Sequence, residues 1–184
     1  MDSRNILSAI GELNLTDCSV KIATIDKIFN VKLDEKLIDI LIINTAVGTE
    51  TFGHYLCVIR AQDTIYMFDS FGKSPEFYNS NLREYLTTYK LPVRIWKRRL
   101  QSFRSLACGA YVVVLIYYIN KYKNLNSPYT LFRRYFTKSY FENDLFVVRH
   151  MYQLFKTLGD CKKIFCHKDL TTKTDCLLMC REVQ

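Results

Sequence analysis

Residues 53–69 read GHYLCVIRAQDTIYMFD, and this stretch decides the fold. Two runs rich in β-branched and aromatic residues, Tyr55–Arg60 and Thr64–Asp69, flank the short polar turn 61–63. This pattern predicts two antiparallel strands joined as a hairpin. The apolar, β-branched run Leu37–Ile43 upstream predicts a further buried strand.

Helical character is clearest in Cys108–Lys121, which is apolar almost all round and predicts a central, buried helix with Cys108 at its N-terminus. Spacing of the other apolar residues predicts helices over 3–14, 79–89 and 129–158 (one or two), a loop over 15–36 and a short strand from Pro92. We therefore expect a single α+β domain over residues 1–184, with a small mixed or antiparallel sheet packed against helices.

Composition places the 184-residue chain among ordinary globular proteins, with 49% hydrophobic and 24% charged residues. The 26 Lys and Arg outnumber the 18 Asp and Glu, and the net charge of +8 favours polyanionic partners such as nucleic acid. The longest apolar run, Tyr111–Ile119, is shorter than the roughly 20 residues of a membrane helix, so we expect no membrane contact. Seven cysteines without a secretory signal favour a reducing compartment over a disulfide framework.

Four residues suggest nucleophilic catalysis. His54 opens the first hairpin strand and Asp69 closes the second, so antiparallel pairing brings imidazole and carboxylate together. Cys108 lies in the first turn of the buried helix, where the helix dipole and a nearby imidazolium would lower the pKa of its thiol. Gln101, seven positions earlier, supplies an amide for a developing oxyanion. The four fit the roles of base, orienting acid, oxyanion donor and nucleophile.

Each of these residues also has an ordinary interpretation. A histidine at a strand start is commonly a surface residue, and a cysteine in an apolar helix commonly packs as a small hydrophobe. Asp69 is an unexceptional residue at the end of a strand, and Gln101 alone carries no signal. Only their joint placement favours a catalytic site.

The sequence resembles the adenain family of viral maturation proteases over roughly residues 6–158, in family order and with similar gaps. The residues that carry the resemblance are Ile43–Ala46, Glu50, Thr51, Gly53, His54, Tyr66–Asp69, Phe71, Gly72, Gln101 and Ala107–Gly109, with weaker similarity at Thr24, Asp26, Lys27, Phe29 and Arg149–Phe155.

The resemblance implies a thiol endopeptidase that processes precursor proteins of a virus during virion assembly, in the virion and the host nucleus. It assigns His54 as general base, Asp69 as orienting acid, Gln101 as oxyanion donor and Cys108 as nucleophile. It also implies cleavage after small-residue motifs containing Gly, a monomer, and DNA as a sequence-independent activator. The net charge of +8 agrees with the last property. Candidate phosphate contacts, for which a merely solvated basic surface is the alternative, are Arg94, Lys97, Arg98, Arg99, Arg133 and Arg134.

Three departures from the family pattern matter. Asp69 stands where adenain has a glutamate, although related SUMO-specific proteases use aspartate. Tyr55 stands where a tryptophan is common. The sequence has no cysteine between Cys57 and Cys108 that could bind an activating peptide covalently, so such a peptide would add non-covalently, as a strand.

The C-terminal segment 159–184 is rich in cysteine. Its spacing, C-x4-C-H-x8-C-x3-C, is not the paired C-x2-C of strong zinc motifs, and we expect no metal, with structural zinc as the alternative. The ligands of such a zinc would be Cys161, Cys166, His167, Cys176 and Cys180. Cys57, in the first hairpin strand, is expected in the core.

Two other functions stay open. A deubiquitinase or SUMO-type isopeptidase would share the same catalytic order but take other substrates. A basic DNA-binding packaging protein would use the charge and leave Cys108 incidental.

Overall fold

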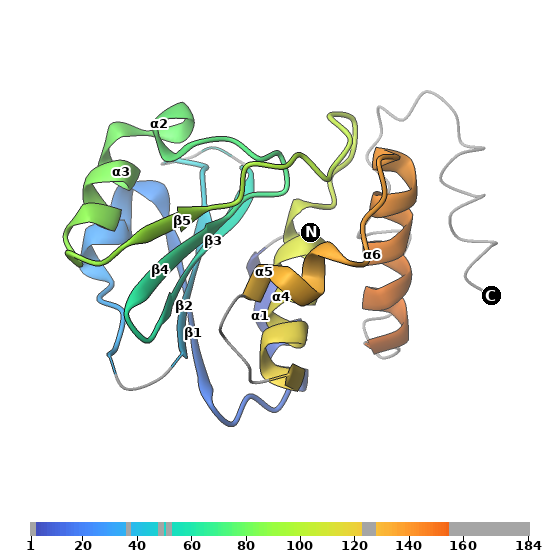
Figure 1. Ribbon diagram of the computed structural model, residues 1–184, viewed down its shortest axis with the longest axis horizontal. Coiled ribbons are helices and arrows are strands. Elements are labelled where there is room, and N and C mark those ends of the chain that lie inside the picture. Colours follow the sequence, from blue (N-terminus) through green and yellow to red (C-terminus); the bar gives the residue numbers. More distant parts are fainter. Residues whose placement is uncertain (1–2, 36–37, 48–49, 51–52, 123–127, 155–184) are drawn as a thin grey trace.

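A five-stranded mixed sheet, in the order β1-β2-β3-β4-β5, organises the computed structural model, which describes residues 3–35, 38–47, 50, 53–122 and 128–154 (Figure 1). The strands are β1 (Cys18–Thr24), β2 (Ile38–Asn44), β3 (Tyr55–Ala61), β4 (Thr64–Phe68) and β5 (Val93–Ile95). The helices are α1 (Ser3–Glu12), the 3₁₀-helix η1 (Ile25–Asn30), α2 (Pro75–Tyr78), α3 (Ser80–Thr87), α4 (Cys108–Tyr122), α5 (Pro128–Arg133) and α6 (Tyr140–Leu154). The predicted class, a single α+β domain, is confirmed.

The predicted hairpin forms the centre of this sheet. β3 pairs antiparallel with both β2 and β4, and the register sets Cys57 opposite Phe68 and Ala61 opposite Thr64. The outer strands run the other way, because β1 is parallel to β2 and β5 is parallel to β4. The sheet is therefore mixed.

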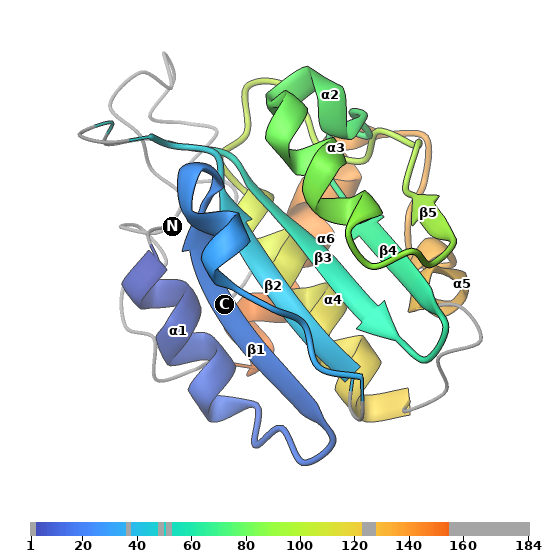
Figure 2. The same cartoon turned by 90° about the vertical axis from the view of Figure 1, so that its left-hand side faces the viewer.

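Helices cover both faces of the sheet, as Figures 1 and 2 show. One core contains α4, which packs against β3, α1, α5 and α6, while the other lies under η1 and α3. β2 contributes side chains to both cores: Ile40 and Ile42 belong to the first, and Leu41 and Ile43 belong to the second. A strand buried on both faces needs apolar residues at every position, which explains the continuous apolar run in β2.

The expectation of a loop over 15–36 is wrong, because β1 and η1 lie there. All seven residues of β1 are half-buried, and Val20 and Ile22 alternate with the polar Ser19 and Lys21. A short edge strand of this kind is stabilised by pairing with a distant neighbour, here β2, and its own sequence gives a weak signal.

The other predicted elements are present with different bounds, and the short helix α2 was not predicted. The helix predicted over 79–89 is α3, preceded by the short α2, and the Asn79 side chain caps α3 by accepting a hydrogen bond from the Asn81 amide at 2.8 Å. The prediction over 129–158 corresponds to α5 and α6, although its residues beyond 154 lie outside the described part. In the described ranges, no helix combines the length and hydropathy needed to span a bilayer.

Candidate active site

The strand register brings His54 and Asp69 together. His54 precedes β3 and Asp69 follows β4, so the two residues lie at the same end of the hairpin. His54 Nε2 lies 2.5 Å from Asp69 Oδ1. The backbone of His54 is fixed from the side of β2, because its amide donates to Thr45 Oγ1 at 2.8 Å and its carbonyl accepts from the Thr45 amide at 2.9 Å.

Asp69 is completely buried and fully hydrogen-bonded. Besides His54, its donors are the backbone amides of Phe71 (3.0 Å) and Lys73 (2.7 Å) and the hydroxyl of Tyr78 (2.9 Å). Burial opposes ionisation, but the hydrogen bond and charge of His54, together with the two amides, hold the pKa of Asp69 below its usual value. Asp69 is therefore a fixed anion against one edge of the imidazole.

Two aromatic rings hold the plane of His54. Phe71 stacks on it at 4.6 Å between centroids and 21° between planes, and Tyr78 at 5.5 Å and 9°. No sequence pattern distinguishes Tyr78 from the other twelve of the thirteen tyrosines, because its role depends on where α2 packs. With its ring on His54 and its hydroxyl on Asp69, Tyr78 contacts both members of the pair.

Cys108 begins α4 and is 9% exposed. Burial would raise the pKa of its thiol, but the hydrogen bond to His54 and the charge of His54, with the backbone amides of Tyr55 and Gly109, lower it. Since Nε2 of His54 is occupied by Asp69, Nδ1 is the ring nitrogen left for the sulfur.

The charges of this trio support one another. Burial would lower the pKa of His54, but its hydrogen bonds to Asp69 and Cys108 and their charges raise the pKa to about 9. The site therefore stabilises a thiolate–imidazolium pair, which is the reactive form of a cysteine nucleophile.

Gln101 is also completely buried, in the segment between β5 and α4. Its Oε1 accepts from the hydroxyl of Ser70 at 2.6 Å, and its Nε2 donates to the carbonyl of Ser105 at 2.6 Å. An amide nitrogen carries two hydrogens, so this bond leaves one for another acceptor. Ser70 directly follows Asp69, which ties the Gln101 segment to the end of β4.

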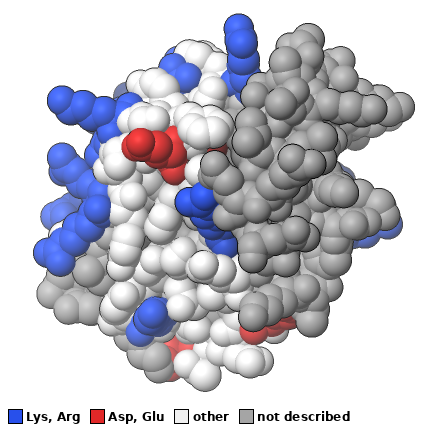
Figure 3. Space-filling model, turned by 90° about the vertical axis from the view of Figure 1, so that its right-hand side faces the viewer, with Lys and Arg blue, Asp and Glu red and all other residues white. Residues whose placement is uncertain are grey.

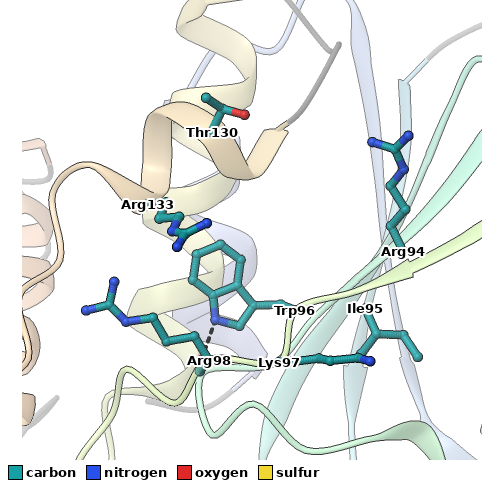
Figure 4. A pocket seen from close by; sticks show the side chains of 7 residues that line it. All are labelled: Arg94, Ile95, Trp96, Lys97, Arg98, Thr130 and Arg133. Atoms are coloured by element: carbon teal, nitrogen blue, oxygen red, sulfur yellow. Dashed lines mark hydrogen bonds between the residues drawn. The ribbon is translucent and has the colours of Figure 1, made fainter.

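The two predicted basic clusters meet at one pocket of about 430 Å³ (Figure 4). Arg94, Lys97 and Arg98 line it from β5 and the segment after it, and Arg133 from α5. Trp96, Ile95 and Thr130 complete the lining. Arg98 has fewer N–H donors left for a phosphate, because its guanidinium already donates to the carbonyl of Thr137.

Arg99 and Arg134 are not among the residues that line this pocket. The guanidinium of Arg99 instead lies 3.3 Å from the ring centroid of Phe103 and 4.2 Å from that of Tyr140, and Arg134 is exposed. Figure 3 shows basic side chains gathered along one margin of the α6 side of the molecule. The six candidate contacts thus divide into four around one pocket and two outside it.

The candidate zinc ligands from Cys161 to Cys180 lie outside the described residues. Within the described part, no group of three His, Cys, Asp or Glu side chains is arranged to hold a metal ion. Cys57 is completely buried in the core, as expected.

Comparison with known proteins gives no relative: no family model matches the chain, and no curated protein sequence matches it significantly.

Proposed function

We propose that the protein is a cysteine endopeptidase with Cys108 as nucleophile. The observation that carries the proposal is that His54 contacts both a buried carboxylate and the thiol at the start of α4. The same three groups also have the chain order of the adenain family. A base that is hydrogen-bonded both to an orienting acid and to the nucleophile is the minimal apparatus of nucleophilic acyl transfer.

The chemistry follows from these positions. The Cys108 thiolate attacks the scissile carbonyl carbon, and the carbonyl electron pair moves to oxygen. The Cys108 amide and the second hydrogen of Gln101 Nε2 are the donors for that oxyanion. The protonated His54 gives its proton to the leaving amine, and a thioester remains on Cys108. His54 then takes a proton from water, whose oxygen attacks the thioester and releases the acid and the thiolate.

For substrates, we propose viral precursor proteins cleaved after Gly-containing motifs during virion maturation, in the virion and the host nucleus. This choice is supported by the resemblance to the adenain family. The isopeptidase alternative shares every residue of the mechanism and differs only in substrate.

The test compares the wild type with Cys108→Ala on fluorogenic peptides that end in Gly-containing motifs, and on ubiquitin and SUMO conjugates. We expect peptide cleavage by the wild type and a loss on the order of 10⁵-fold in the variant. Cys57→Ala is the matched control, because it removes another buried thiol. Full activity of Cys108→Ala would refute the proposal, and faster cleavage of ubiquitin or SUMO conjugates would favour the isopeptidase.

DNA as activator is a second proposal, supported by the convergence of Arg94, Lys97 and Arg133 on one pocket. We expect DNA to raise the peptidase rate and the gain to fade with salt. Replacing all three by Ala should reduce the slope of log Kd against log salt by about 3. Arg83→Ala is the control, since Arg83 is 68% exposed and pairs with Glu76.

DNA binding also bears on the packaging-protein alternative. The alternative would be favoured if the wild type cleaves no peptide and the Cys108→Ala variant binds DNA as the wild type does. A slope unchanged by the triple substitution would remove this pocket from the interface.

A further inference from the structure

The segment between β5 and α4 carries Gln101, yet it contains no helix or strand. The end of β4 holds part of its backbone, because the amides of Leu100 and Gln101 donate to the Ser70 carbonyl at 2.8 and 3.1 Å, and side chains of α6 add further hydrogen bonds. Two adjacent residues of α6, Asn143 and Asp144, are 1% and 3% exposed and face this segment. Both are polar and lie beside the apolar face through which α6 packs against α4.

Their hydrogen bonds reach both neighbours of Gln101. Asn143 Nδ2 donates to the carbonyl of Leu100 at 3.1 Å, and the amide of Ser102 donates to Asp144 Oδ2 at 3.2 Å. The other oxygen of Asp144 accepts from the hydroxyl of Tyr111 at 2.9 Å. Because Tyr111 belongs to α4, one carboxylate links three elements: α6, the Gln101 segment and the helix that begins with Cys108.

Helix packing alone does not require this pair. One turn further along α6, the equivalent positions are Val147 and Val148, both buried, and Met151 continues the same face. Apolar residues thus make much of the remaining contact, beside one hydrogen bond between the Tyr118 hydroxyl of α4 and His150 Nε2 at 3.0 Å. A buried carboxylate is also unfavourable in itself: burial raises the pKa of Asp144 to about 6, against hydrogen bonds from Tyr111 and Ser102 that lower it.

We propose that Asp144 is a positioning residue, which acts through the backbone of Ser102 to hold Gln101 in place for the oxyanion. The inference rests on the proposed peptidase function. An oxyanion donor contributes through its exact placement, and a displacement of about 1 Å can cost about 10²-fold in rate. Loss of Asp144 should therefore lower kcat while leaving substrate binding and the Cys108–His54 pair intact.

The experiment uses the full chain with Asp144→Ala and Asp144→Asn. Alanine removes both acceptors. Asparagine keeps the network: its Oδ1 accepts from the Ser102 amide, and its Nδ2 donates to the Tyr111 hydroxyl, which itself lies 3.3 Å from the Leu100 carbonyl. The matched control is Asp39→Ala, because Asp39 is an equally buried acid whose partners, Lys21 and the Asp34 amide, lie at the opposite end of the sheet.

Two kinds of measurement are made. The first gives KM and kcat, with kcat normalised to the amount of alkylatable Cys108, and the second is amide hydrogen exchange over residues 100–106. In Asp144→Ala we expect kcat to fall roughly 10- to 100-fold with KM within about 3-fold, and exchange in the segment to rise. Asp144→Asn should restore both to near wild type. Asp39→Ala should change neither, although it lowers stability.

The inference is overturned if Asp144→Ala leaves exchange in the segment unchanged, or if Asp144→Asn loses as much kcat as Asp144→Ala. It is also overturned if Asp39→Ala reproduces the loss. A wild type that cleaves nothing, while exchange still rises in Asp144→Ala, refutes the peptidase but leaves Asp144 as the residue that holds the segment.

Discussion

Two buried cysteines on adjacent elements have opposite chemistry. Cys57 of β3 and Cys108 of α4 belong to the same apolar core, and α4 packs against β3. Burial, reinforced by the charge of Asp69, raises the pKa of Cys57. The pKa of Cys108 is lowered, although it is almost as deeply buried.

The difference lies in one contact. Cys108 has His54 as a hydrogen-bond partner, whereas Cys57 lies in the apolar core within the negative field of Asp69. A buried thiol in this fold is therefore inert unless a cation shares its environment. The open question is whether His54 alone causes the difference in pKa between the two thiols.

Replacing His54 by Ala should make Cys108 resemble Cys57. Without the imidazolium, burial dominates and the pKa of Cys108 rises. We expect peptide cleavage to fall by roughly 10⁴-fold or more, and alkylation of Cys108 at pH 7 to fall on the order of 10²-fold. The measurement compares the rates of peptide cleavage and of Cys108 alkylation in the wild type and the variant. Unchanged alkylation would mean that the start of α4, and not His54, activates the sulfur.

Replacing Asp69 by Asn should reduce the difference between Cys108 and Cys57 indirectly, through His54. The amide no longer stabilises a charged imidazole or fixes its tautomer, so we expect kcat to fall roughly 10³- to 10⁴-fold. The matched control is Asp144→Asn, which also neutralises a buried carboxylate but should stay near wild-type activity. Equal losses of kcat in the two variants would show that Asp69 is not the orienting acid of His54.

The two thiols should separate by pH. Since the pKa of Cys108 is lowered and that of Cys57 raised, iodoacetamide at pH 6–7 should modify Cys108 on the order of 10²-fold faster than Cys57. Above a pH of about 9, His54 loses its proton, so cleavage should fall while the thiolate still alkylates. Mass spectrometry of the labelled peptides, with a parallel pH–rate profile, measures both. Faster labelling of Cys57 would contradict the comparison.

The smallest effect on activity is expected for Cys57→Ala. Cys57 is completely buried, so the substitution leaves a small cavity and should lower the free energy of unfolding by about 1–2 kcal/mol. The kcat per folded molecule should stay within about 2-fold of wild type. Denaturant melts and active-site titration separate the two quantities. A large loss of kcat would show that Cys57 does more than pack.

Prediction from the sequence succeeded where the signal was local. The hairpin places His54 beside Asp69. A short turn and two runs rich in β-branched and aromatic residues specify this pairing, and they are visible in residues 53–69. The buried helix α4 was visible for the same reason. β1 was missed because an edge strand with polar alternation depends on its partner β2.

The rest of the site depends on contacts between distant segments. Tyr78 reaches Asp69 only because α2 packs over the end of the hairpin, and Asp144 reaches Ser102 across 42 residues of sequence. Arg94 and Arg133 likewise share a pocket only through the packing of α5 near β5, whereas Arg99, in the same basic run, is held elsewhere by Phe103 and Tyr140. No local pattern distinguishes these residues.

Local sequence patterns specify the central strands and the buried helix, and they bring His54 to Asp69, because hydrophobic patterning and turn chemistry act over a few residues. Long-range packing selects which of the two buried thiols lies against the imidazole, and it sets the contacts that hold Gln101. Those contacts arise when α4 packs onto the sheet and α6 packs onto α4. Hydrophobic packing is non-directional and leaves no short-range signature of the partners it brings together.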